Sequence, residues 1–331
     1  MTKKAQCAIF RVNTTEYCLW DWNLHERNME FINGINPEYF MYQAKVHFDN
    51  IESEDKQLAS VALRTAYHHG LETLFTLLGA TVQAPNCVYG WILKSRAGQV
   101  RALAKRIDNQ EQTIFNKLGM NRVSWYEISR RMHAYLRGNV SDEEEIVQFF
   151  AELWTRFYDD FSDEMQKDEY NSIKHGFRTA LGGFAMSFGL EDLRRKTDSS
   201  PLKMFTVGGY GFGSTFLSIR KIEGSPCPKK DPHFCVTRNS INWVPENMLH
   251  GLGYISMSLN NIMSYLKILN GEDASRCRFC YSTDPEAFYK PWDIGLELIS
   301  GSTDTKVTEG NIRRLGKKEI DEALEKFKIK D

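Results

Sequence analysis

The sequence has no excess of either charge and no long apolar run. Its 331 residues contain 42 Lys and Arg against 43 Asp and Glu, so any nucleic acid must be held by a local positive patch. No stretch approaches the roughly 18 apolar residues of a membrane-spanning helix. Arg11, Asn13 and Glu16 interrupt the N-terminal region where a signal peptide has its apolar core. We therefore expect a cytoplasmic protein with no membrane partner.

Common enzyme signatures are also lacking. The sequence contains no Gly-x-Ser-x-Gly, His-Glu-x-x-His or kinase motif. The glycine run at 208–213 lacks the Gly-Lys-Ser/Thr ending of a P-loop, and a hairpin is the better interpretation. The seven cysteines are odd in number and show no disulfide-like spacing, so we expect mostly free thiols in a reducing compartment.

What is present is mainly helical patterning. Ser141-Asp-Glu-Glu-Glu is a helix start with acidic residues in the first turn, and Trp243-Val-Pro-Glu opens another helix. The long helices are expected to form one bundle and cover 53–83, 143–160, 163–188 and 245–269. Shorter helices are predicted over 86–95, 98–108, 122–137 and, at the basic C-terminal end, 308–328.

Strand-like composition occurs in two regions. Short strands are predicted at 8–11 and 17–22, and a small β insertion lies where Gly and Pro punctuate apolar stretches between the helices. The predicted architecture is therefore mainly α, a helical bundle with a small β insertion. Its parts are an aromatic-rich segment 1–50, the bundle 51–200, the β insertion 201–244, a bundle helix 245–270 and a C-terminal loop and basic helix 271–331.

Two polar stretches are candidate sites. On a helix over 163–188, the side chains of Asn171, His175 and Arg178 share one face away from the apolar arc, and Lys174 adjoins the histidine. On the 53–83 helix, Arg64 projects into the apolar arc and needs a partner or a wet cavity. The alternatives are a solvated polar face for the first stretch and, for Arg64, an internal ion pair or a snorkelling side chain.

These stretches carry a family resemblance. The spacing of Arg64 and His69 resembles the Arg-x4–6-His motif of HEPN-domain proteins, and Asn171-Ser-Ile-Lys-His175-Gly is similar to the Asn…Lys-His-Gly signature of divergent HEPN-like domains. The family's arginine is expected near position 170, where this chain has Tyr170. The resemblance covers at most 53–190 and 245–270. It implies an RNA-directed helical domain, and as an activity a metal-independent endoribonuclease of a prokaryotic toxin or antiphage defence system.

The implied chemistry needs a base near neutral pH and a cation for the charge on the phosphorane. Histidine and arginine supply both without a metal. The resemblance therefore makes His175 with Arg178, or His69 with Arg64, the minimal catalytic pair. In the first pair, Asn171 would orient the imidazole or the phosphate.

The cysteines give a further hypothesis, a structural zinc ion. Cys277-Arg-Phe-Cys280 has the spacing of half a zinc site. Cys227 and Cys235 would complete four thiolates if the β insertion folded onto the loop after the 245–269 helix. The alternative is unrelated free cysteines, and no other cofactor is expected.

Two functions remain open from the sequence. The first is the HEPN-like RNA-directed protein, which requires His175 or His69 to be accessible beside an arginine. The second is a non-enzymatic interaction or ligand-binding module, whose polar stripes form a pocket or meet a protein partner or a second copy. The resemblance slightly favours the first.

Overall fold

The computed structural model describes residues 5–136, 143–183, 185–190, 203–209, 211–221, 233–282, 286–292, 307–313 and 316–328. The chain is mainly helical with small antiparallel sheets, as predicted. It divides into two compact units, one made of 1–167 and 244–295 and the other of 168–243 and 296–331. None of the helices in the described ranges is long and apolar enough to span a membrane.

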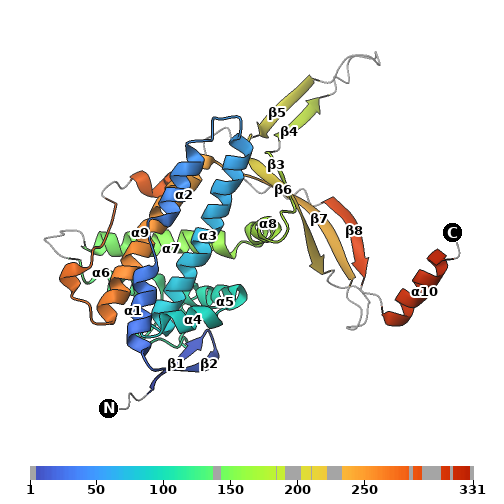
Figure 1. Cartoon of the computed structure of the whole chain (residues 1–331). Helices are drawn as coiled ribbons and strands as arrows, with labels where there is room; N and C mark the ends of the chain where they lie inside the picture. The colour runs from blue at the N-terminus through green and yellow to red at the C-terminus, as the bar shows by residue number, and fades with distance from the viewer. Residues whose placement is uncertain are drawn as a thin grey trace. The chain divides into compact units, whose positions relative to one another are not determined.

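The first unit is a helical bundle around α3 (Lys56–Gln83). Helices α2 (Tyr39–Phe48) and α9 (Pro245–Leu269) pack along α3, and α7 (Glu143–Ser162) crosses it (Figure 1). Helix α3 is buried along most of its length, which explains why its sequence is apolar on more than one face. The shorter helices of this unit are α1 (Leu24–Gly34), α4 (Val88–Lys94), α5 (Ala97–Asp108) and α6 (Trp125–His133), with 3₁₀ turns η1 (Ala274–Arg276) and η2 (Glu286–Trp292).

The N-terminal strands form a hairpin that is bound to this bundle. Strands β1 (Gln6–Val12) and β2 (Thr15–Asp21) pair antiparallel, which confirms the strands predicted at 8–11 and 17–22. The Gln83 side chain accepts a hydrogen bond from the Asn13 N–H at 2.8 Å and donates one to the Asn13 carbonyl at 3.0 Å. Trp91 Nε1 donates to the Arg11 carbonyl at 2.8 Å. Three contacts from buried side chains therefore fix the hairpin on α3 and α4.

The second unit contains the β insertion. Strands β3 (Thr179–Leu181), β6 (Gly213–Lys221), β7 (His233–Asn242) and β8 (Val307–Arg313) form an antiparallel sheet in the order β3-β6-β7-β8. Strands β4 (Ala185–Leu190) and β5 (Lys203–Gly209) form a separate pair. Helix α8 (Glu164–Lys174) leads into this unit, and α10 (Lys317–Lys328) follows β8.

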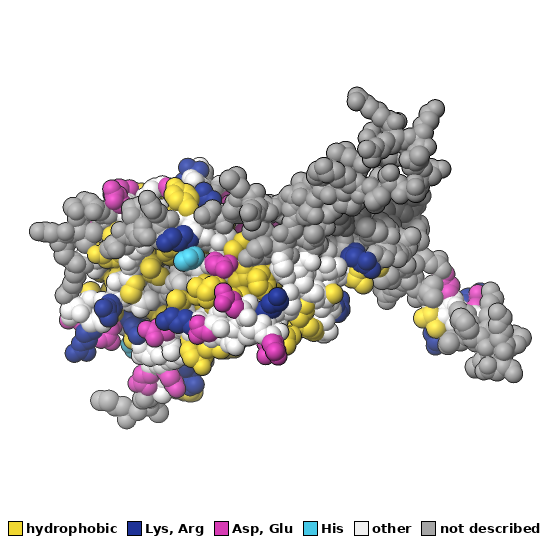
Figure 2. All heavy atoms as spheres, turned by 90° about the horizontal axis from the view of Figure 1, so that it is seen from above, with side chains coloured by type: hydrophobic (Ala, Val, Ile, Leu, Met, Phe, Trp, Pro, Cys, Tyr) yellow, Lys and Arg dark blue, Asp and Glu magenta, His cyan; other side chains and the backbone are white. Residues whose placement is uncertain are grey.

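On the described part of the face in Figure 2, both signs of charge lie among exposed hydrophobic side chains.

Two predicted helices are wrong in part. The helix predicted over 163–188 ends at Lys174, because Gly176 and Phe177 take left-handed backbone conformations with φ of +93° and +49°. The helix predicted over 308–328 begins only at Lys317. Residues 307–313 instead pair with β7. In both places the strand pairs with a segment remote in sequence. A local helical pattern of apolar residues carries no information about such a partner.

The close approach of α3 and α9 yields a stability prediction at Gly251. A Cβ atom at this position would lie 2.7 Å from the Tyr67 ring. We expect Gly251→Ala to lower the unfolding free energy by about 2 kcal/mol through overpacking. Urea unfolding measures this, with Gly98→Ala as control, because a Cβ at Gly98 meets nothing within 4 Å. Equal midpoints for the two variants would contradict the packing described.

Candidate functional site

The structure places His175 on an exposed turn. Lys174 ends α8, so the helical face predicted to unite Asn171, His175 and Arg178 is wrong. The turn is ordered by its backbone, since the His175 N–H donates to the Asn171 carbonyl at 3.0 Å and the Arg178 N–H to the Ser172 carbonyl at 2.7 Å. Lys174, His175 and Arg178 are all exposed, and Asn171 is half-buried. The result is an accessible histidine near two cations.

The second predicted pair is not brought together. Arg64 is only 4% exposed, with its guanidinium 3.4 Å from Gln166 Oε1 and 3.4 Å from Met248 Sδ. His69 is exposed and lies against α2, with its ring 5.2 Å from that of Phe40. Five residues along a helix turn the side chain by about 140°, so the two side chains diverge. Arg64 is therefore a buried residue of the bundle, and His69 belongs to its surface.

Asp160 joins α3, α7 and η2 in a half-buried polar cluster near Arg64. Its carboxylate accepts hydrogen bonds from the Tyr67 hydroxyl, from Gln166 Nε2 at 3.1 Å and from Trp292 Nε1 at 3.3 Å. Burial, and then the charge of Asp160, raise the pKa of Tyr67 well above its usual value. Each donor comes from a different segment of the chain, which indicates that the cluster stabilises the bundle.

Within the part of the chain that the structure describes, a groove between α2 and α9 is a candidate binding site. Its cavity volume is about 590 Å³. Met41, Tyr42 and Met257 supply apolar surface, and Lys45 and Glu38 supply opposite charges. The remaining lining residues are Asn36, Pro37, Ser256, Asn260 and Cys280.

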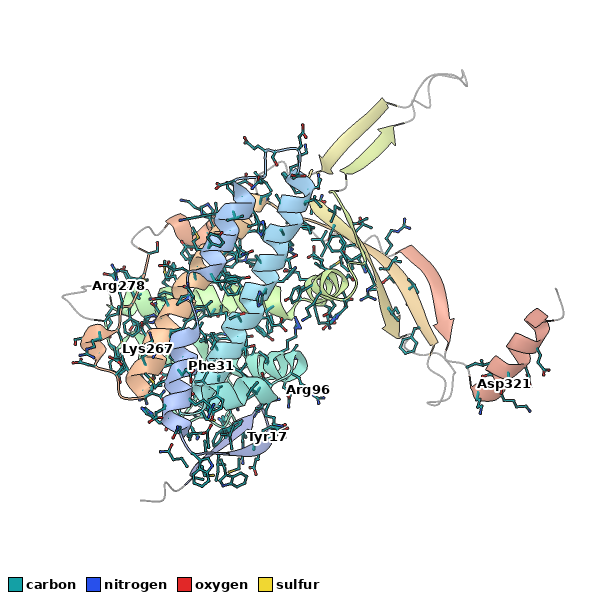
Figure 3. The ribbon with its side chains drawn as sticks, in the orientation of Figure 1. Tyr17, Phe31, Arg96, Lys267, Arg278 and Asp321 are labelled. Carbon is teal, nitrogen blue, oxygen red and sulfur yellow. The ribbon has the colours of Figure 1, made fainter. Side chains whose placement is uncertain are left out.

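The end of the groove at Cys280 is held by side chains of α9. Asn261 pairs with the Cys280 backbone through two hydrogen bonds, Nδ2 to the carbonyl at 2.7 Å and Oδ1 from the N–H at 2.8 Å. Asn260 Nδ2 and Ser264 Oγ both donate to the Arg278 carbonyl, at 2.8 and 2.7 Å. Figure 3 labels Arg278 in this segment and Lys267 on α9. These contacts position Cys280 in the groove wall.

His133 supports the same segment from inside the bundle. His133 Nδ1 lies 2.9 Å from the Ser129 carbonyl, which can only accept a hydrogen bond, so Nδ1 carries a proton. Ser129 Oγ donates its own proton to the Val147 carbonyl at 2.8 Å. Nε2 then accepts from Asn261 Nδ2 at 3.1 Å. The imidazole is therefore neutral, and burial lowers its pKa to about 4. Protonation of Nε2 would place its N–H opposite the N–H of Asn261 Nδ2, and two donors cannot form a hydrogen bond with each other.

The four cysteines of the zinc hypothesis lie in different parts of the chain. Cys277 and Cys280 follow η1 in the first unit, and Cys235 lies on β7 of the second unit. Cys227 lies outside the described residues. Burial, and then Glu272, raise the pKa of Cys277, which disfavours the thiolate that a metal requires. In the described ranges, no three or more His, Cys, Asp or Glu side chains are grouped to hold a metal ion.

Sequence reasoning missed Asp160, His133 and the groove. For His133 a signal existed, since it continues the apolar spacing of Trp125, Ile128 and Met132 on α6. The groove had none, because its walls come from segments more than 200 residues apart. No family model, curated protein or solved structure matches the chain.

Proposed function

We propose that the helical unit is a non-enzymatic ligand-binding module whose site is the groove between α2 and α9. The observation that supports this most is the groove itself, whose volume of about 590 Å³ falls within the range of about 300–1,000 Å³ of small-molecule sites. Its walls combine apolar side chains with a few polar groups, as such sites do. The methionines adapt to a ligand's shape, since their unbranched thioether side chains repack readily.

The charges along the groove suggest the class of ligand. Lys45 and Glu38 stand seven residues apart, about two helical turns or 10 Å, so the groove is positive at one end and negative at the other. Ser256 Oγ is buried without a hydrogen-bond partner in the described part of the chain and lines the same groove. We infer an organic anion with one acidic group near Lys45, an aromatic or aliphatic body along Tyr42, and a neutral end toward Glu38.

This proposal predicts specific binding of an aromatic sulfonate probe. Titration with anilinonaphthalene sulfonate, followed by its fluorescence, should show one saturable site. Loss of one charged contact or one stacking ring should weaken binding roughly fivefold to tenfold, or about 1 kcal/mol. We therefore expect this loss in Lys45→Gln and in Tyr42→Ala.

Matched controls lie on other helices and turns. Lys105 and Tyr135 are exposed residues that do not line the groove. Lys105→Gln and Tyr135→Ala should bind the probe as the wild type does. Equal affinity in all four variants would mean that the probe binds elsewhere and would remove the support for a groove site.

The RNA-directed function is our second proposal, and one observation favours it. His175 is accessible between the cations Lys174 and Arg178, and Phe177 on the same turn is 53% exposed. Cations bind phosphate and an exposed aromatic ring stacks on bases. An endoribonuclease of a toxin or antiphage defence system would place this turn at the scissile phosphate. Both proposals assume a cytoplasmic setting.

Cleavage of a labelled structured RNA tests this second proposal. His175→Ala should abolish cleavage and leave the melting temperature unchanged, because the side chain is exposed. Arg178→Gln should reduce the rate, and His25→Ala, an exposed histidine on α1, should not. His69→Ala tests the other motif. Full activity in both His175→Ala and His69→Ala, or an inactive wild type, would leave the ligand-binding module as the better proposal.

A further inference from the structure

Two cysteines meet on the outer face of the N-terminal hairpin. In the register of β1 and β2, Cys18 lies opposite Ile9, and Cys7 lies opposite Trp20. Alternate residues of a strand point to the same face. Ala8 and Phe10 are buried, so Cys7 and Cys18 both point outward.

The two thiols are close enough to react with each other. Their Sγ atoms lie 2.7 Å apart, compared with about 2.0 Å in a disulfide bond. Cys7 is exposed and Cys18 is partly exposed, so a small reagent can reach the pair. By contrast, Cys87 is fully buried and burial raises its pKa.

We propose that Cys7 and Cys18 are a redox-active dithiol that low-molecular-weight disulfides, such as oxidised glutathione, convert to an intramolecular disulfide. The Cys7 thiolate attacks one sulfur of the small disulfide and releases one small thiolate, which leaves a mixed disulfide on Cys7. The Cys18 sulfur then attacks the Cys7 sulfur and displaces the second small thiolate. One disulfide is reduced to two thiols as one protein disulfide forms, and the two cysteine protons pass to the released thiols.

The order of the two attacks follows from the surroundings of the sulfurs. Cys7 is the more exposed thiol. The hydrogen bond to Cys7, followed by burial, raises the pKa of Cys18 to about 11. Cys18 therefore keeps its proton and donates it to the Cys7 thiolate, which is the nucleophile in exchange. Cys18 becomes the resolving thiol once Cys7 has been modified.

The hairpin is fixed to the bundle on the face away from the two thiols. Its inner face is held by Gln83 and Trp91, through the hydrogen bonds to Asn13 and Arg11 described above. Oxidation would link the two strands in their present register. The exposed side chains of Ile9 and Trp20, 66% and 69% exposed, flank the pair, so the bond would stiffen an apolar surface.

Mass spectrometry of the full chain tests the proposal. Reduced protein is incubated with oxidised glutathione, quenched with acid, and digested without reductant. The wild type should lose two hydrogens and yield a Cys7–Cys18 linked peptide, with two fewer free thiols than the seven of the reduced chain. Cys18→Ser should instead retain one glutathionyl group on Cys7, and Cys7→Ser should give no link.

Two controls separate this result from general thiol oxidation. Cys277→Ser should still form the link, and wild type unfolded in urea should lose the preference for it. A wild type that retains glutathione on Cys7 without linking, or whose Cys7 and Cys18 stay reduced, would overturn the proposal. The wild-type result does not depend on any variant folding, and it is independent of the groove.

Discussion

Acidification from pH 7 to pH 4 should lower the unfolding free energy by about 3 kcal/mol through His133 alone. The pKa of this histidine is about 4 in the folded chain, against an ordinary value near 6.5. Between these values the unfolded chain binds the proton and the folded chain does not. His133 therefore leaves the unfolding free energy almost unchanged above about pH 6.5. The unfolding free energy falls as the pH drops from there toward 4.

Urea unfolding across this pH range, in wild type and in His133→Gln, isolates the effect. The variant should lack the acid-dependent loss from this position, whatever its stability at pH 7. His25→Gln, which replaces an exposed histidine, should keep the wild-type pH dependence. If wild type and His133→Gln lost stability in parallel, the neutral histidine between Ser129 and Asn261 would be refuted.

Replacement of Asp160 by alanine should destabilise the bundle by about 3 kcal/mol. It removes the acceptor of three donors, and one of them, the Tyr67 hydroxyl, belongs to a side chain that is 1% exposed. A buried donor without a partner costs about 1–3 kcal/mol, and the loss of a carboxylate near the buried Arg64 adds to this. Asp160→Asn retains an acceptor oxygen and should cost less.

The neighbouring acid is a matched control for Asp160. Burial, and then Asp108, raise the pKa of Asp159, so its charge is not stabilised in the fold. Asp159→Ala should therefore change stability by no more than about 0.5 kcal/mol. Chemical denaturation compares both variants with the wild type. Similar effects of the two substitutions would contradict the role given to Asp160.

Local signals account for the parts of the fold that the sequence predicts correctly. The sequence predicts a helix over 245–269, and α9 spans Pro245–Leu269, because proline at the first turn and an apolar stripe are both local features. Where the structure has β8, the sequence predicts a helix. Its partner is β7, about 70 residues earlier, and only that pairing favours the strand. The end of α8 at Lys174 likewise depends on backbone angles at Gly176 and Phe177.

The candidate sites were less predictable than the fold. The burial of Arg64 was expected from its position in the apolar arc, but its neighbours Gln166 and Met248 come from two other helices. The structure does not bring Arg64 and His69 together, because the two side chains leave α3 in different directions. Tertiary packing brings the walls of the groove together, and no short motif encodes such an arrangement.

The central claim, that the groove between α2 and α9 binds an organic anion, is tested most directly by methyl NMR. The chain has 11 methionines, and two of them, Met41 and Met257, line the groove. Met132 is fully buried on α6 and serves as an internal reference. With methionine methyl labelling and titration of anilinonaphthalene sulfonate, we expect the Met41 and Met257 signals to shift together and saturate, while that of Met132 stays in place. Saturable binding that leaves Met41 and Met257 unshifted would contradict the claim.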